Sequence, residues 1–245
     1  MKKYILAIIL LIFVSKTFAD SYNLQYYDNY DIKTGEEKTL FILDFSNSMN
    51  EFLYNERKID VMLKTMREIL PKINPQNRVG MRAYGYRMGF TPYDSCKASK
   101  LMIPIEKGGS VLISKQIERT RAMGMTPITY SLKQALYKDL LNYQGKKHII
   151  LLTDGGENCD ESPCTFIVRE IKNQPNLKID VIAYDVRESD DISQLQCVAL
   201  VTRGRFYTVK TAGELANSLN QSLSISKEVD AKIIPRWSHQ RLVQL

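Results

Sequence analysis

The sequence predicts an α/β fold in which a mostly parallel sheet has helices on both faces. Short continuous apolar runs, typical of strands buried on both sides, recur along the chain. Segments with apolar residues at steps of three and four separate these runs. Acidic side chains follow two of the runs directly, and sheets of this class bind ligands at the carboxyl ends of their strands.

The elements alternate in the order that such a sheet requires. Pro71 stops the first helix, Pro163 fits the first position of a later one, and the TAGE sequence at 211–214 is a capping box for the last. The predicted elements are a strand at 38–44, a helix at 59–70, strands at 78–84 and 100–105, helices at 111–121 and 128–140, a strand at 147–154, a helix from 163, a strand at 177–185, a helix at 190–204, a strand at 205–209 and a helix from 211.

The first nineteen residues have the layout of a secretory signal peptide. Two lysines precede the apolar run 4–14, and Ala19 offers the small residue at which cleavage is expected. The run is shorter than the roughly 20 residues of a membrane span, so an uncleaved anchor is the alternative. We therefore expect a periplasmic or secreted protein with no transmembrane segment in the mature chain. Residues 20–36 are a polar lead-in, 37–225 the folded domain and 226–245 a tail.

Charge and cysteine content fit export. Removal of Lys2, Lys3 and Lys16 takes the formal net charge of +7 to about +4, and the remaining basic residues are scattered. A nucleic-acid partner is disfavoured, because that function needs a basic stripe. The four cysteines are expected to form two disulfides in an oxidising compartment, and the residues themselves leave three pairings open.

Five oxygen-bearing side chains lie at the expected carboxyl edge of the sheet. The stretch FILDFSNSMN places Asp44, Ser46 and Ser48 directly after the first strand, Thr126 follows in GMTP, and Asp154 precedes two glycines. Each hydroxyl alone is ordinary in a turn. Together, two carboxylates and three hydroxyls suit Mg²⁺, which prefers oxygen ligands and few carboxylates. Hydroxyl ligands leave the ion under-neutralised, so it attracts an anionic oxygen from outside.

This set resembles the metal-ion-dependent adhesion site of von Willebrand factor type A domains, as found in integrin I domains. The resemblance covers roughly residues 37–225 and implies a doubly wound, six-stranded sheet in the order 3-2-1-4-5-6, with the strand at 100–105 antiparallel. It implies that the two serines bind the metal directly and that Thr126 binds it directly or through water. Asp44 and Asp154 would act largely through water.

The resemblance also implies a cation and a partner. The ion would be Mg²⁺, with Mn²⁺ or Ca²⁺ as alternatives, and its open position would take an Asp or Glu carboxylate of a protein partner. Similar exported domains suggest a local Cys159–Cys164 disulfide, which leaves Cys96 with Cys197. We expect Asp44→Ala to leave the fold nearly intact, as a surface-loop change costing no more than about 1 kcal/mol.

The sequence thus predicts an exported binding protein and not an enzyme. The alternatives are a structural component of an envelope assembly with a stabilising metal and a metal-dependent hydrolase. A Ser-His-Asp hydrolase is disfavoured because the only histidines are His148, which opens a buried strand, and His239 in the tail. No nucleophile elbow, Walker A loop or dinucleotide fingerprint is present. Glu157, Asp160 and Glu161 either tune the site or are solvated loop charges, and we favour the second interpretation.

Overall fold

A six-stranded sheet forms the centre of the protein. The structure is a computed structural model and describes residues 36–231; the predicted signal peptide and most of the predicted lead-in and tail lie outside them. The strands follow the order β5-β4-β1-β6-β7-β8, with β5 antiparallel to β4 and the others parallel, as predicted. The strands are β1 (Glu37–Asp44), β4 (Arg78–Tyr84), β5 (Ser99–Lys107), β6 (Lys146–Thr153), β7 (Leu177–Tyr184) and β8 (Phe206–Val209).

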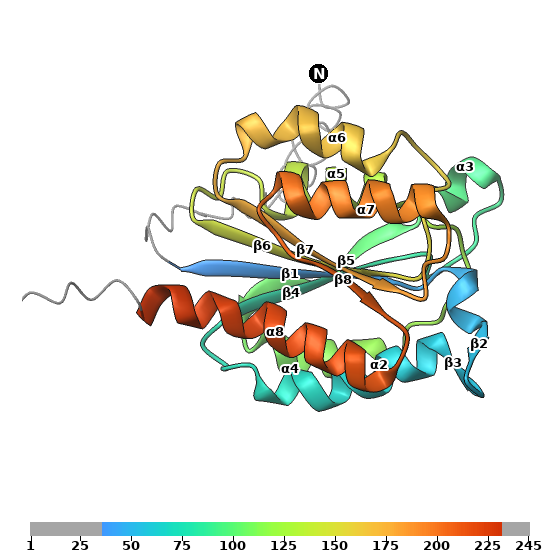
Figure 1. Ribbon diagram of the computed structural model, residues 1–245, viewed down its shortest axis with the longest axis horizontal. Helices are drawn as coiled ribbons and strands as arrows, with labels where there is room; N and C mark the ends of the chain where they lie inside the picture. The colour runs from blue at the N-terminus through green and yellow to red at the C-terminus, as the bar shows by residue number, and fades with distance from the viewer. Residues whose placement is uncertain (1–35, 232–245) are drawn as a thin grey trace, which may run out of the picture. The chain divides into compact units, whose positions relative to one another are not determined.

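Helices cover both faces of the sheet (Figure 1). On one face lie α2 (Lys58–Ile69), α4 (Gly109–Ile117) and α8 (Ala212–Ala231). On the other lie α5 (Ile128–Gln134), α6 (Pro163–Glu170) and α7 (Ser189–Val201). The shorter helical elements are η1 (Asn47–Asn50), η2 (Leu70–Lys72), α3 (Pro92–Ser95), η3 (Ala135–Asp139) and η4 (Ile171–Asn173).

The apolar run of β1 fills both halves of the core because successive strand residues point to opposite faces. Phe41 and Leu43 pack with α2, α4 and α8, whereas Leu40 and Ile42 pack with α5, α6 and α7. All four side chains are fully buried. A strand with no polar side is therefore central, and its carboxyl end places Asp44 between β4 and β6.

The structure departs from the predicted elements in three places. The predicted helix 128–140 is α5 followed by the π-helical turn η3, whose last residue, Asp139, pairs with buried Arg82 at 2.7 Å for both contacts. The hairpin of β2 (Phe52–Leu53) and β3 (Glu56–Arg57) and the helix α3 are too short for a periodicity signal, and we did not predict them. Helix α8 continues to Ala231, beyond the predicted domain end at 225.

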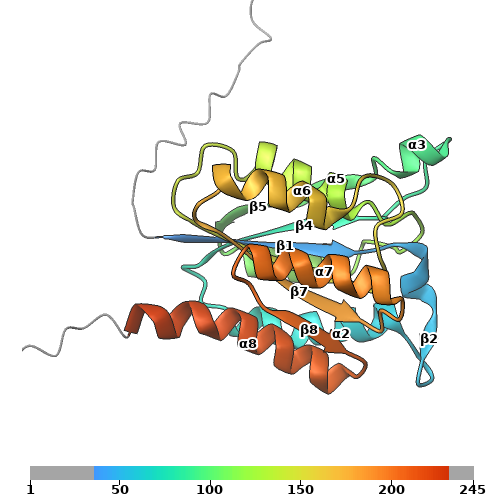
Figure 2. The same ribbon diagram turned by 45° about the horizontal axis from the view of Figure 1, so that its top comes forward.

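The loops that matter for the site gather at one edge of the sheet. The β2–β3 hairpin and α3 lie at the end of the sheet where β1 terminates (Figures 1 and 2). The first residues of β1 and the last turn of α8 lie at the opposite end. Among residues 36–231, no helix combines the length and the apolar character needed to cross a membrane.

Candidate metal centre

Asp44, the last residue of β1, is the buried anchor of the site. Its Oδ1 accepts a hydrogen bond from the Ser46 backbone N–H at 2.7 Å. Its Oδ2 accepts from the Tyr84 and Thr153 hydroxyls, both at 2.9 Å, and from the Asp154 N–H at 3.3 Å. The side chain is fully buried, so our expectation of a surface-loop residue is wrong. Truncation of Asp44 would leave several buried donors unpaired, which costs more than about 1 kcal/mol.

Three oxygens converge beside this anchor. The η1 turn brings the Ser46 and Ser48 hydroxyl oxygens to 2.9 Å from each other, and Ser48 donates to Asp154 Oδ1 at 2.7 Å. Adjacent ligands of an octahedral Mg²⁺ ion lie about 3.0 Å apart, given metal–oxygen distances of about 2.1 Å. Both oxygen–oxygen distances are therefore close to the edge length of such an octahedron. The donor set fits a hard divalent cation.

Thr126 is held at the same edge through the backbone. Ser46 forms an isolated bridge with Gly124, and the Asn47 N–H donates to the Gly124 carbonyl at 2.9 Å. A side chain at Gly124 would put a Cβ 2.5 Å from the Arg87 carbonyl oxygen, so this approach of loops requires glycine. The Thr126 N–H donates to Asn158 Oδ1 at 3.0 Å, which ties the threonine to the loop after Asp154.

The electrostatics of Asp154 differ from those of a simple surface acid. Burial, reinforced by the negative charge of nearby Asp44, raises the pKa of Asp154 to about 6, although Ser48 and Lys58 act in the opposite direction. Burial and Asp44 likewise hold the pKa of Tyr84 well above its usual range, so this hydroxyl remains a donor to Asp44. Two carboxylates are thus held together without full compensation. A divalent cation would supply the missing charge.

Lys58 is the main member of the site that the sequence did not predict. It is the first residue of α2, its side chain is 5% exposed, and its ammonium donates to Asp154 Oδ2 at 3.0 Å. The burial of Lys58 disfavours its charged form, but the contacts with Asp154 and Glu51 together outweigh this, so the pKa of Lys58 is raised. A lysine at the start of an amphipathic helix carries no sequence signal for this role, because lysine is ordinary on helix surfaces.

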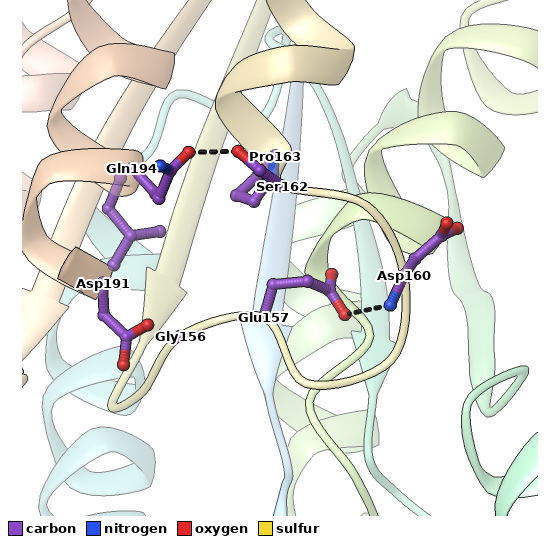
Figure 3. Close-up of a pocket in the computed structure, with 8 residues that line it drawn as sticks. Gly156, Glu157, Asp160, Ser162, Pro163, Asp191 and Gln194 are labelled. Atoms are coloured by element: carbon purple, nitrogen blue, oxygen red, sulfur yellow. Dashed lines mark hydrogen bonds between the residues drawn. The ribbon is translucent and has the colours of Figure 1, made fainter.

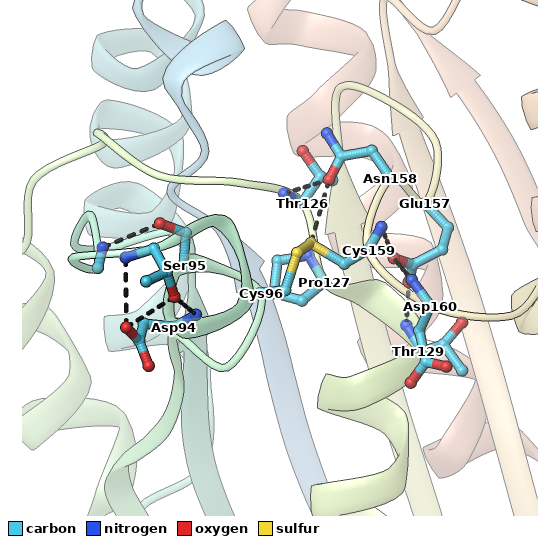
Figure 4. Close-up of a disulfide and its surroundings, with 12 residues drawn as sticks. Asp94, Ser95, Cys96, Thr126, Pro127, Thr129, Glu157, Asn158, Cys159 and Asp160 are labelled. Atoms are coloured by element: carbon cyan, nitrogen blue, oxygen red, sulfur yellow. Dashed lines mark hydrogen bonds between the residues drawn. A yellow bond between two sulfur atoms is a disulfide. The ribbon is translucent and has the colours of Figure 1, made fainter.

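The disulfides correct our prediction. The structure joins Cys96 to Cys159, with Cα atoms 5.3 Å apart, and Cys164 to Cys197, with Cα atoms 5.5 Å apart, so the predicted Cys159–Cys164 and Cys96–Cys197 pairs are wrong. Cys164 lies in the first turn of α6, which packs against α7 and its Cys197. Cys159 instead lies beside Cys96 at the end of α3 (Figure 4).

Glu157 organises the loop that carries Cys159. Its carboxylate accepts hydrogen bonds from the Thr129, Cys159 and Asp160 backbone N–H groups at 2.5, 2.6 and 3.0 Å. The prediction of a solvated charge is therefore wrong for Glu157. Asp160 and Glu161 are surface charges that pair with Lys133 at 2.9 and 3.0 Å.

A cavity of about 240 Å³ lies between this loop and α7 (Figure 3). Its walls include Glu157, Ser162, Asp191 and Gln194. The Glu157 carboxylate is taken up by backbone donors, and the Ser162 hydroxyl donates to the Gln194 side chain. Burial raises the pKa of Asp191, and the charge of Glu188 adds to this. The polar groups of this cavity form hydrogen bonds that hold the loop after Asp154 in place.

Comparison with known proteins agrees with this architecture. No family model matches the sequence. The uncharacterized protein YwmC of Bacillus subtilis (strain 168) is 25% identical over 191 residues, which cover 76% of this chain and 83% of YwmC.

Within residues 36–231 no group of three or more His, Cys, Asp or Glu side chains is placed to hold a metal, so the candidate centre depends on hydroxyls.

Two solved structures identify the fold. The vWF domain of the type V pili tip protein Mfa5 from Porphyromonas gingivalis has a TM-score of 0.60 at 13% identity, covering 86% of this chain and 99% of that one. Proximal thread matrix protein 1 from the mussel byssus has a TM-score of 0.59 at 18% identity over 78% of this chain. The match spans 46% of the mussel chain, and a further crystal structure of that protein has a zinc-occupied MIDAS motif. The present chain has the fold of von Willebrand factor type A domains.

Proposed function

We propose that this protein is an exported binding protein that engages a protein partner through a divalent cation. The single observation that carries the proposal is the convergence of the Ser46 and Ser48 hydroxyls with Asp154 Oδ1 at 2.7–2.9 Å, beside a buried Asp44. Mg²⁺ is the expected ion, with Mn²⁺ or Ca²⁺ as alternatives, because all the donors are oxygens.

Each residue has a distinct part in this proposal. Ser46 and Ser48 hold the ion directly, and Thr126 completes the hydroxyl set directly or through water. Asp154 contributes charge, and Asp44 fixes the geometry because its oxygens already accept from the Ser46 N–H, Tyr84 and Thr153. The cation supplies an electrophilic coordination position for an Asp or Glu carboxylate of the partner. No residue is assigned the role of a general base.

The surface around the site favours a protein as the partner. Large apolar side chains are exposed on the three loops that surround it: the hairpin after Ser48, the loop after β4 and the loop before Gly124. Clusters of exposed aromatic and methionine side chains are typical of protein interfaces. We call this set the apolar rim; it consists of Phe52, Tyr54, Met88, Phe90, Tyr93 and Met123, with exposed fractions from 43% to 106%.

The descriptions of similar structures point the same way. One description, that of Mfa5, names a pilus tip and the other, that of the mussel protein, the matrix of a byssus thread. They support binding, and not catalysis, as the role of this fold here.

Calorimetric titration of Mg²⁺ tests the metal centre. The wild-type protein should bind one ion, and Ser46→Ala should weaken binding at least tenfold through the loss of a direct ligand. Ser193→Ala is the matched control, because this exposed serine on α7 bonds only within its own helix at 2.8 Å. Equal affinities of all three proteins would contradict the metal assignment.

A capture experiment with magnesium or chelator tests the partner. The immobilised protein should retain a partner from envelope extract only when the ion is present, and substitution of one Asp or Glu of the identified partner should abolish retention. A chelator that lowers the unfolding temperature without changing partner binding would favour a structural role for the metal.

Export is tested separately by intact-mass measurement. The mature protein should lack residues 1–19, as cleavage after Ala19 requires. A mass that includes those residues would show that the segment is retained as an anchor.

A further inference from the structure

A buried lysine beside a metal site needs an explanation, because taking an ammonium out of water is costly. The Lys58 ammonium lies 3.0 Å from Asp154 Oδ2, 3.1 Å from Glu51 Oε2 and 3.8 Å from Asp185 Oδ2. Glu51 is 65% exposed, so solvent screens its charge. Asp185 also pairs with Arg187 at 2.7 Å. Asp154 is therefore the partner on which the Lys58 charge acts most strongly.

The two oxygens of Asp154 face different groups. Oδ1 accepts from Ser48 on the proposed metal side, whereas Oδ2 accepts from Lys58. This division fixes the carboxylate so that one oxygen faces the hydroxyls. It also means that part of the negative charge of Asp154 is already neutralised before any metal arrives.

We propose that Lys58 is a built-in counter-cation that lowers the charge available to the metal and so leaves the loaded site with a stronger pull on a carboxylate ligand. This inference rests on the proposed metal function and specifies how that site would favour an anionic partner. The two negative charges of Asp44 and Asp154 together balance a divalent ion. Adding Lys58 gives these three side chains and the ion one net positive charge, before the charges of Glu51 and of the Asp185–Arg187 pair are counted.

Removal of the Lys58 charge should have opposite effects on the two ligands. A unit charge about 6 Å from a divalent ion changes its affinity about tenfold even at the dielectric constant of water. Lys58→Met should therefore bind Mn²⁺ at least tenfold more tightly than the wild-type protein. Acetate, a minimal carboxylate probe, should bind the Mn²⁺-loaded variant more weakly, measured as the fall in water proton relaxivity when acetate displaces a bound water.

The controls separate charge from folding. Arg57→Met removes the same charge one residue earlier, where the arginine is 46% exposed and pairs with Asp60, and it should change neither affinity by more than about twofold. Lys58→Arg keeps the charge and should restore wild-type Mn²⁺ affinity to within about threefold. If Lys58→Met does not fold by circular dichroism, Lys58→Gln is measured instead.

The outcomes distinguish this inference from the metal proposal. A wild-type protein that binds no Mn²⁺ would overturn the metal function itself. Wild-type binding with unchanged or weaker Mn²⁺ affinity in the folded Lys58 variant would overturn only the counter-cation role. Tighter metal and weaker acetate binding in the variant, with Arg57→Met unchanged, would support it.

Discussion

Two of the buried clusters of charged side chains lie near opposite ends of the sheet, and they are built differently. We call the first the metal edge; it consists of Asp44, Ser46, Ser48, Lys58, Thr126 and Asp154. The second, the histidine network, consists of Glu37, His148, Asp180 and Ser222. In the network, His148 Nε2 lies 3.0 Å from Asp180 Oδ2, and the Ser222 hydroxyl donates to the same oxygen at 2.5 Å.

The pKa values of the buried aspartates Asp154 and Asp180 are shifted in opposite directions. The pKa of Asp180 is lowered, because hydrogen bonds and the charge of His148 outweigh its burial. The pKa of Asp154 is raised to about 6, because burial and Asp44 outweigh Lys58 and Ser48. In the histidine network Asp180 is compensated within the chain by His148 and Ser222, whereas the metal edge keeps two carboxylates together at a cost. Such unrelieved charge is typical of functional sites.

The largest effect on stability is expected from a variant that disrupts the histidine network. Asp180→Ala should lower the free energy of unfolding by about 3–5 kcal/mol, because it removes the buried partner of His148 and the acceptor of the Arg205 N–H at 2.8 Å. Metal affinity, measured by calorimetry on the folded protein, should stay within about twofold of wild type. A loss of both properties would show that the two clusters are coupled.

Removal of each disulfide in turn should show which bridge supports metal binding and which one only stabilises the packing of α6 on α7. The Cys96–Cys159 bridge closes a loop of 63 residues and the Cys164–Cys197 bridge a loop of 33. Replacing both cysteines of either bridge by serine should lower the free energy of unfolding by about 4 kcal/mol, because the unfolded chain gains loop entropy. The first double variant should also bind Mg²⁺ more weakly, because its bridge holds the loop after Asp154. The second serves as the matched control, and equal metal affinities in both would contradict this difference. Urea unfolding and calorimetry measure the two effects.

Ser48→Ala sharpens the comparison at the metal edge. It removes a proposed ligand and the hydrogen bond to Asp154, so Mg²⁺ affinity should fall about tenfold or more while stability changes by only about 1 kcal/mol. Thermal unfolding with and without Mg²⁺ measures both quantities. A variant that keeps its magnesium-dependent stabilisation would exclude Ser48 as a ligand.

The smallest expected effect is on pH dependence. The pKa of His148 is raised, because contacts with Asp180 and Glu37 outweigh its burial. Its contribution to stability is therefore complete below about pH 6.5 and is lost as the pH rises through the raised pKa. The lowered pKa of Asp180 contributes stability above about pH 3.9, which is lost as the pH falls. His148→Gln should flatten the decline in unfolding free energy as the pH rises above about 6.5, in urea titrations with chelator. An unchanged slope would assign the decline to other groups.

Sequence patterns predicted the sheet well because the central strands contain continuous apolar runs, such as residues 40–43 and 149–152. An apolar run such as the one within residues 38–44 is stable only as a strand in a sheet that is covered on both faces. The run therefore predicted that β1 is a central strand. The positions of Asp44 and Asp154 followed from the strand ends. The hydrogen-bonded contacts of Asp44, Ser46, Ser48 and Asp154 bear out the expected clustering, while metal binding by these residues and Thr126 remains a prediction.

The remaining features depend on long-range contacts. Lys58 reaches Asp154 across 96 residues of sequence, and the burial of Asp44 depends on Tyr84 from a neighbouring strand. The disulfide pairing was wrong because it is decided by the turn that Glu157 organises and by the packing of α6 on α7. Neither leaves a local pattern in the residues around the cysteines.

The direction of β1 has a mechanical consequence. Its first residue lies at the end of the sheet where α8 also ends, and its last, Asp44, lies at the metal edge (Figure 2). If a ligand held there is pulled away from the end of the sheet where β1 begins, the tension runs along β1, which pairs in parallel with β4 and β6 along its length. Hydrogen bonds on both sides of the strand are then loaded together in shear, instead of opening one at a time. The fold is oriented to resist force applied through the proposed metal edge.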